Sequence, residues 1–295
     1  MSFSATTKRR LTEILPGRRC CRRALLYGML QGGRGFSARE MALQTEHPEV
    51  GAVYASLLDQ LCEVTADTEK GRFHIVTVPE SKRAAVLADF GHSTDELSVR
   101  LNRGNFHCDD CAASYIRGLF LSCGAVSNPE TDYHLEFNVP SLTLSRDVLS
   151  LWEELGYDAK SIRRKGDNVV YFKDSNVIEE CLTLMGAGAS ALELIQIKMV
   201  KDIRNRSNRA ANCDMANLSK VAAAGEQHRR ALATIRKHGG FANLPDPLRE
   251  LAQVRWENPE LSLRELGELL EPPLTRSGVN HRLQKLCAIA EELEQ

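Results

Sequence analysis

No stretch of this 295-residue chain approaches the roughly 18 consecutive apolar residues that a membrane-spanning helix needs. The basic N-terminus is not followed by the apolar core of a signal peptide. The sequence also has no Walker loop, no nucleophile elbow and no glycine fingerprint for a dinucleotide. We therefore expect a cytoplasmic protein that does not bind membranes and needs no cofactor.

The chain has few features of a disulfide-linked or metal-binding protein. Its nine cysteines, an odd number spread along the sequence, are typical of reduced thiols. Cys108 and Cys111 form one CxxC pair, which would supply two of the four ligands that a structural zinc site needs. No second such pair accompanies it, although His107 and His134 are candidate third ligands, and Cys20–Cys21 is interpreted as the buried start of a helix. The sequence therefore predicts no metal site.

The formal net charge of −1 conceals a strong segregation of charge. Residues 1–40 carry nine basic and two acidic side chains, and residues 198–237 carry ten and three, a net of +7 each. Residues 41–197 carry a net of −11 and residues 238–295 a net of −4. This asymmetry indicates a surface for a polyanion beside an acidic middle, although solvated basic helices would give the same composition.

One motif occurs twice, ninety positions apart. A segment that starts at Cys21 recurs from Cys111, and a period of this length indicates a duplicated folding unit rather than a short helical repeat. The matching pairs are Cys21 and Cys111, Leu26 and Ile116, Gly28 and Gly118, Met29 and Leu119, and Leu30 and Phe120.

Each motif helix is followed by the same predicted order of elements. In the second copy we expect a strand at 133–139, a helix at 145–155, a hairpin at 161–173 and a helix at 176–185 capped by Ser175. The first copy offers a strand at 37–44, a helix at 48–61, a hairpin at 63–78 and a helix at 81–90. The predicted fold is α+β, with two pseudo-symmetric αββαββα repeats before an all-α C-terminal domain.

The segment from Tyr115 to Val126 resembles the LAGLIDADG motif of homing endonucleases. In that family two such helices pack at a pseudo-two-fold axis, and an acidic residue before the last glycine holds the catalytic metal. Here Cys123 precedes Gly124, and its counterpart in the first copy is Gly33, or Arg34 if the alignment shifts by one.

These substitutions argue against nuclease chemistry. Mg²⁺ requires hard oxygen ligands, which a thiol and a glycine do not supply. The nearby acids Asp109 and Asp110 precede the second motif helix, about three turns from Cys123. We therefore interpret Gly33 and Cys123 as degenerate former active-site positions and predict that the protein is not an enzyme.

The segment 191–220 is predicted to be a basic linking helix. Its combination of cationic and amide side chains is typical of phosphate and base contacts, although a solvated linker is the alternative. The candidate DNA-binding residues are Arg204, Asn205, Arg206, Asn208, Arg209 and Lys220.

The C-terminal residues predict a helix-turn-helix. Helices are expected at 221–238, 247–258, 262–270 and 277–293, and Ser262 with Glu265 forms a capping box. In this plan the second helix of the motif enters the major groove with its N-terminus first. We expect Ser277 to be its N-cap.

The last predicted helix has an apolar and a polar face. Val279, Leu283 and Leu286 are expected to face the core, and no acidic residue occurs between Arg276 and Cys287. Arginine can read guanine and asparagine can read adenine, although a purely structural helical unit is the alternative. The candidate DNA-binding residues here are Ser262, Arg264, Arg276, Ser277, Asn280, His281, Arg282 and Lys285.

A degenerate LAGLIDADG pair with a C-terminal helix-turn-helix resembles the WhiA family over nearly the whole chain. The most specific segments are 204–209, 262–270, 272–273 and 277–283. The resemblance implies a DNA-binding protein of Gram-positive bacteria, active in sporulation gene control in actinobacteria and in cell division or chromosome segregation in firmicutes. The first motif departs from the family in its glycines Gly32, Gly33 and Gly35.

The predicted domains are a first repeat at 1–105, a second at 106–190, the linking helix at 191–220 and the helix-turn-helix domain at 221–295. Two functional hypotheses follow. The first is a nucleoid-associated transcription regulator that binds double-stranded DNA. The second is a scaffold of the division or chromosome machinery whose acidic body binds a regulatory or division protein, with DNA affinity secondary. A metal-dependent nuclease is a distant third.

Overall fold

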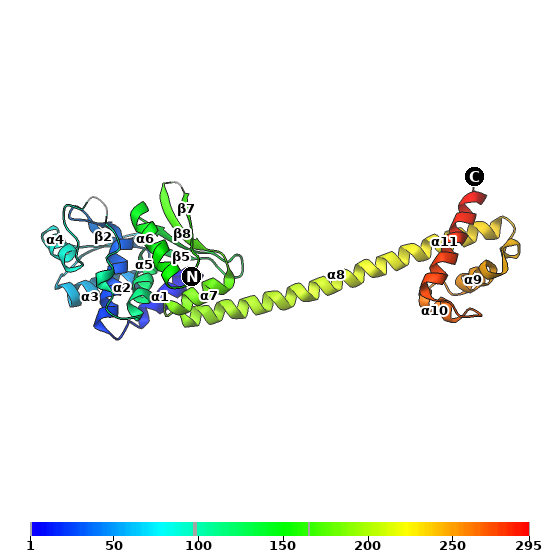
Figure 1. The fold of residues 1–295 in the computed structure, drawn as a ribbon, viewed down its shortest axis with the longest axis horizontal. Coiled ribbons are helices and arrows are strands. Elements are labelled where there is room, and N and C mark those ends of the chain that lie inside the picture. The colour runs from blue at the N-terminus through cyan, green and yellow to red at the C-terminus, as the bar shows by residue number, and fades with distance from the viewer. Residues whose placement is uncertain (1, 97–98, 165, 295) are drawn as a thin grey trace. The chain divides into compact units, whose positions relative to one another are not determined.

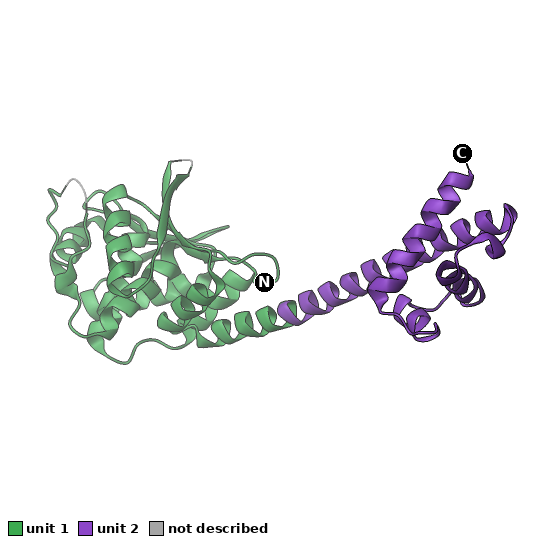
Figure 2. Ribbon diagram, turned by 45° about the vertical axis from the view of Figure 1, so that its right-hand side comes forward, with its two compact units in different colours: residues 1–201 green, residues 202–295 purple. Residues whose placement is uncertain are grey.

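The computed structural model describes residues 2–96, 99–164 and 166–294 of the chain (Figure 1). The chain divides into two compact units, residues 1–201 and residues 202–295 (Figure 2). Each unit has its own cluster of buried apolar side chains.

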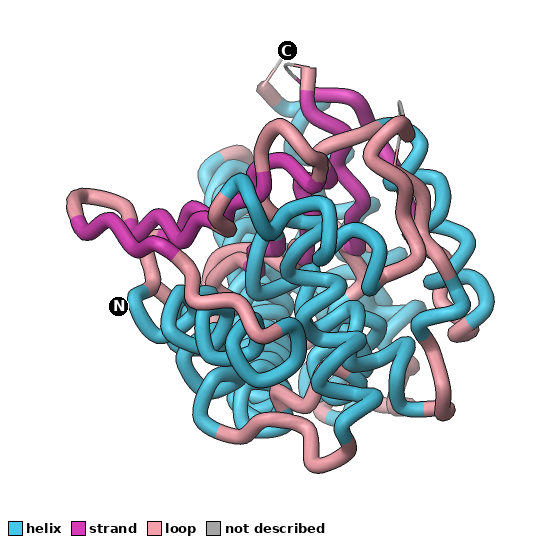
Figure 3. The backbone as a smooth tube through the Cα atoms, turned by 90° about the vertical axis from the view of Figure 1, so that its left-hand side faces the viewer, coloured by secondary structure: helices cyan, strands magenta, loops and turns pink. Residues whose placement is uncertain are grey.

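The first unit contains the two predicted repeats. Each has the order αββαββα and one four-stranded antiparallel sheet, with strand orders β1-β2-β4-β3 and β5-β6-β8-β7. The first repeat comprises α2 (Arg19–Gly32), β1 (Arg34–Phe36), β2 (Met41–Thr45), α3 (Pro48–Cys62), β3 (Asp67–Lys70), β4 (His74–Thr77) and α4 (Glu80–Asp89). The second comprises α5 (Asp110–Cys123), β5 (Gly124–Val126), β6 (Leu135–Val139), α6 (Leu142–Glu154), β7 (Lys160–Arg164), β8 (Asp167–Phe172) and α7 (Ser175–Leu184). In Figure 3 most of the strands gather in the upper part of this unit.

Local sequence accounts for these elements. Along β6 the side chains of Leu135, Phe137 and Val139 are buried while the residues between them are more exposed, which is the period of two of a strand with one face on the core. Helix α7 begins one residue earlier than predicted. Its N-cap is Asp174, whose Oδ1 accepts hydrogen bonds from the amides of Asn176 (2.8 Å) and Val177. The prediction of Ser175 as the cap was therefore wrong.

Helices α2 and α5 cross with their backbones in contact. A Cβ at Gly28 would lie 2.1 Å from the carbonyl oxygen of Tyr115, and a Cβ at Gly118 would lie 2.0 Å from that of Leu25. The two contacts are related by the ninety-residue offset of the repeat, so the crossing is pseudo-symmetric. Only glycine permits this approach, because the Cβ of any other residue would overlap a backbone atom of the partner helix.

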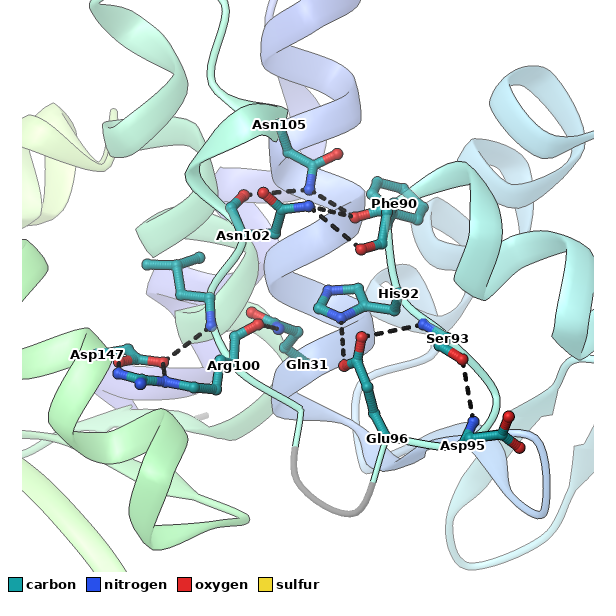
Figure 4. A network of polar contacts seen from close by, with 12 residues as sticks. Gln31, Phe90, His92, Ser93, Asp95, Glu96, Arg100, Asn102, Asn105 and Asp147 are labelled. Atoms are coloured by element: carbon teal, nitrogen blue, oxygen red, sulfur yellow. Dashed lines mark hydrogen bonds and ion pairs between the residues drawn. The ribbon is translucent and has the colours of Figure 1, made fainter.

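Polar contacts, buried or partly buried, hold the segment between the repeats (Figure 4). The hydroxyl of Tyr27 accepts a hydrogen bond from the amide of Asn102 (2.9 Å) and lies 2.8 Å from Nε2 of His92. Further along, Arg100 Nε pairs with Oδ2 of Asp147 at 3.2 Å. The segment, which includes the short helix η1 (Arg103–Asn105), is thereby attached both to α2 and to α6.

A helix precedes the repeats where the sequence indicated only a basic segment. In α1 (Phe3–Glu13) the hydroxyl of Thr7 donates to the hydroxyl of Ser190 at 2.9 Å. At the other end of α1, the guanidinium of Arg117 donates to the carbonyl oxygens of Leu11 and Ile14. Because terminal carbonyls of a helix lack partners within it, Arg117 closes this end of α1 and holds it against the second motif helix.

One helix, α8 (Gly188–Lys237), replaces the two that the sequence predicted on either side of residue 220. No glycine or proline occurs from 189 to 224, and the one interior glycine, Gly225, costs only about 1 kcal/mol and does not break the helix. The end of α8 joins the core of the second unit. The other elements are η2 (Phe241–Asn243), α9 (Asp246–Glu257), α10 (Leu263–Glu268) and α11 (Arg276–Leu293), and their core residues include Leu251, Leu266, Leu270, Val279, Leu283 and Leu286.

Candidate nucleic-acid interface and former catalytic positions

The turn between α10 and α11 is tight. The amide of Leu274 donates to the carbonyl of Gly267 at 2.9 Å, and a Cβ at Gly267 would lie 2.2 Å from the carbonyl oxygen of Leu274. Thr275 then caps α11, because its hydroxyl accepts from the amide of Gly278 at 3.3 Å. The expectation that Ser277 is the N-cap was wrong, and Ser277 lies within the first turn of the helix.

Helix α11 has one buried side and one exposed side. Val279, Leu283 and Leu286 are buried, as the apolar spacing predicts. At 100° per residue, Ser277, His281 and Lys285 recur every four residues on the side away from the core. The predicted DNA-binding residues of α11 that are exposed are Arg276, Ser277, Asn280, His281 and Lys285.

Three other predicted contacts already have partners within the protein. Arg282 is half-buried, and its Nη1 donates to the carbonyl oxygen of Pro247 at 3.2 Å, which ties α11 to the start of α9. The hydroxyl and amide of Ser262 form the capping box of α10 with Glu265. Arg264 pairs with Glu268 at 3.2 Å on the exposed side of α10. A surface pair of this kind is weak, so it can exchange for a phosphate.

The predicted DNA-binding residues of α8 lie on an exposed segment of the helix. Every side chain from Asp202 to Ala223 is exposed. At 100° per residue, Arg204 and Asn208 share one side of the helix, Asn205, Arg209 and Lys220 lie next to it, and Arg206 lies further round. The cations therefore cover more than half of the circumference instead of a single stripe.

Gly33 and Cys123, which the sequence predicts to be degenerate active-site positions, lie at the ends of the crossed helices. Strand β1 starts at Arg34 and β5 at Gly124, which are again ninety residues apart, so Gly33 is the counterpart of Cys123. A Cβ at Gly32 would lie 2.1 Å from Oγ of Ser122, so the helix ends remain in contact here. Burial raises the pKa of the Cys123 thiol to about 12, and the thiol is therefore neutral.

A lysine that no sequence pattern singles out occupies this region. Lys8 of α1 is only 8% exposed, and its Nζ lies 5.7 Å from the ring centroid of Phe120. Burial lowers the pKa of Lys8 to about 8, and the neighbouring groups include Cys123 and Glu46. The sequence could not predict that Lys8 lies near Cys123, because α1 is far from α5 along the chain and reaches it only after folding.

The structure corrects the interpretation of the CxxC pair. The thiols of Cys20, Cys21, Cys108 and Cys111 all lie within 4.8 Å of one another. A second pair of thiols, from the preceding repeat, therefore lies beside Cys108–Cys111, and the expectation that no such pair accompanies it was wrong. Neither His107 nor His134 belongs to the group.

Comparison with known proteins assigns the chain to a family. It is 35% identical to "Probable cell division protein WhiA" of Carboxydothermus hydrogenoformans over 306 aligned positions, which cover 99% of this chain and 98% of the relative. The protein belongs to the WhiA family. Another WhiA relative, from Desulforudis audaxviator, is 36% identical over the same share of each chain.

Family models agree with both parts of this WhiA protein. The "WhiA LAGLIDADG-like domain" matches residues 112–204 and the "WhiA C-terminal HTH domain" matches residues 207–290. A crystal structure of full-length WhiA from Thermotoga maritima is 26% identical with a TM-score of 0.56 and covers 99% of both chains. Among the described helices, none combines the length and apolarity needed to cross a membrane.

Proposed function

We propose that this WhiA protein is a sequence-specific DNA-binding regulator of cell division, chromosome segregation or sporulation that associates with the nucleoid and does not cleave DNA. The observation that supports it is the exposed side of α11. This helix follows a tight turn in the domain that matches the WhiA helix-turn-helix model, and it has no acidic residue from Arg276 to Cys287. The relatives' name, "Probable cell division protein WhiA", supports the biological setting.

The N-terminal half of α11 would read the bases. Its exposed residues Ser277, Asn280 and His281 lie where a recognition helix meets base edges, and Asn280 suits the N6 and N7 atoms of adenine. Arg276 and Lys285 would contact phosphate or guanine. Arg282 would act indirectly, because its bond to Pro247 sets the angle between α11 and α9.

The basic segment of α8 would add affinity without sequence preference. Arg204, Arg206 and Arg209 are exposed and can each neutralise one phosphate. Replacing all three by alanine should weaken binding to every sequence alike. It should also reduce the slope of log affinity against log salt by about 0.9 for each phosphate that is no longer neutralised.

The central experiment uses the full chain. Binding sites are mapped by crosslinking across the genome, and fluorescence anisotropy then measures affinity for a mapped duplex and for single-base variants of it. We expect Asn280→Ala to lower discrimination at one base pair by about 1–3 kcal/mol. Lys82→Ala, which removes an exposed lysine of α4, is the control and should leave discrimination unchanged.

Two results would redirect this proposal. Equal losses on all sequences for Asn280→Ala would make it a backbone contact. No binding of duplex DNA even at low salt would favour the scaffold hypothesis, in which the acidic residues 41–197 bind a protein partner.

The absence of nuclease activity has its own test. Buried Lys8 and the neutral thiol of Cys123 lie together at the end of the motif helix, where the LAGLIDADG resemblance would place a divalent ion, and a cation there would oppose metal binding. Supercoiled plasmid incubated with Mg²⁺ should remain intact. Nicking that disappears in an Asp109→Ala or Asp110→Ala variant would contradict the proposal.

A further inference from the structure

Four cysteines meet where the two motif helices begin. Cys20 and Cys21 lie in the first turn of α2, Cys108 lies just before α5, and Cys111 lies in its first turn. We call these four residues the cysteine cluster. Each repeat contributes one pair, and Cys21 and Cys111 are counterparts in the ninety-residue offset. The glycine crossing of α2 and α5 fixes how the two pairs face each other.

The sulfur positions match a tetrahedral metal site. Sγ of Cys108 lies 3.6 Å from that of Cys20, 3.5 Å from that of Cys21 and 3.5 Å from that of Cys111. All four sulfurs lie within 4.8 Å of one another. Zinc bound to four thiolates at about 2.3 Å places the sulfurs about 3.8 Å apart, which is close to these separations.

The alternatives fit less well. A disulfide needs sulfurs about 2.05 Å apart and would use two of the four thiols, whereas Cys108 is nearly equidistant from the other three. Four thiolates also leave a tetrahedral ion no open position for a substrate. Cys21 and Cys111 are buried, and Cys20 and Cys108 are half-buried, as in a closed structural site.

The local electrostatics favour bound thiolates. Both helices point their N-terminal amides, the positive end of the helix dipole, toward the cysteine cluster. Arg18 lies beside it and pairs with Asp110 at 3.2 Å. These groups offset part of the negative charge that four thiolates and one divalent ion leave.

We infer that the cysteine cluster binds one zinc ion as a structural site that joins the two LAGLIDADG-like repeats. The ion links the start of α2 to the start of α5, at the opposite end of the helix pair from the former catalytic positions. Since the ligands come from both repeats, the site forms only when the repeats have docked, and binding free energy stabilises that docked state.

The first measurement is the metal content of the full chain. Protein purified without chelator or added metal should contain about one zinc per chain by plasma mass spectrometry. Replacement by cobalt(II) should give the intense visible bands of a tetrahedral thiolate site. Chelation should lower the unfolding temperature of the first unit by several degrees, and zinc should restore it.

Variants then assign the site. Cys108→Ser should reduce zinc content from about one to near zero per chain, while Cys62→Ser, a half-buried thiol elsewhere in the same unit, should keep it. If Cys108→Ser does not fold, zinc binding is tested with Cys20→Ser, at a half-buried position, and with the cobalt spectrum of the unaltered chain. Zinc content that is unchanged in both variants, an iron cluster with inorganic sulfide, or a disulfide within the cysteine cluster would overturn the inference.

Discussion

Two glycines permit the contact on which the first unit is built. Gly28 and Gly118 face the partner backbone at distances where any Cβ would overlap a carbonyl oxygen. The neighbouring residues Leu25 and Tyr115 are fully buried, so moving the helices apart would disturb the packed core. The tight crossing in turn holds the ends of α2 and α5 together.

Gly118→Ala should therefore destabilise the first unit strongly. The added methyl group would lie 2.0 Å from the carbonyl oxygen of Leu25, and separating the helices should cost about 3 kcal/mol or more. Denaturant unfolding measures the loss. Gly188→Ala, at an exposed helix start with nothing within 4 Å of the new Cβ, is the matched control and should be nearly neutral. An equally small effect of Gly118→Ala would show that the helices are not in contact.

Lys8 should make stability depend on pH. Its pKa is lowered to about 8 in the folded protein by burial, against 10.5 unfolded, so charged Lys8 destabilises the folded state below pH 8. The cost is relieved as pH rises from about 8 to 10.5, where the unfolded chain still binds the proton.

The variant Lys8→Met should be more stable than the unaltered protein by up to about 3 kcal/mol at pH 7. This advantage should shrink as pH rises toward 10.5, which urea unfolding at a series of pH values would show. Arg9→Met removes an exposed charge from the same helix and should not change the pH dependence. A constant advantage of Lys8→Met at all pH values would mean that Lys8 is not buried as a cation.

At the scale of elements, the position of α11 depends on its first turn. Thr275 caps the helix through Gly278, and Gly267 lets the preceding turn pack against α10. The cap and the proposed base contacts are thus made by different residues. Ser277 lies on the exposed side and is free of the capping role that the sequence suggested.

Thr275→Ala should therefore lower the unfolding free energy of the second unit by about 1 kcal/mol, because the amide of Gly278 loses its acceptor. Ser277→Ala should change it by less than about 0.5 kcal/mol. Equilibrium denaturation of both variants tests the assignment. The reverse order of effects would restore Ser277 as the cap.

For the whole molecule, two separate cores predict two unfolding transitions. The clusters of residues 1–201 and 202–295 share no buried side chain, and residues 202–223 of α8 are exposed throughout. Leu251 is fully buried in the second core, so Leu251→Ala should lower the unfolding free energy of residues 202–295 by about 2–5 kcal/mol. In calorimetry the transition of that unit should move to lower temperature, and the transition of the first unit should stay where it is. A single transition that moves as a whole would contradict this division.

Much of the fold could be predicted because it is local. The alternation along β6 and the capping box at Ser262 depend on residues close in sequence, and the ninety-residue repeat is found by comparing two segments of the chain directly. The polar side of α11 could be predicted for the same reason. The sequence predicted helices on both sides of residue 220 but not that they form the single helix α8, because two helices that abut and one continuous helix have the same local pattern.

The amino-acid order was enough to identify the duplication, the helix-turn-helix and the absence of acidic residues at positions 33 and 123, since repeats, caps and residue chemistry are visible within single segments of the chain. Only in the folded chain does Lys8 reach Cys123 and do Cys20 and Cys21 meet Cys108–Cys111. Those groups are more than eighty residues apart along the chain. The spacing of residues within one segment therefore does not predict which residues of the other segment it will contact, because that contact is made only when α2 and α5 pack together.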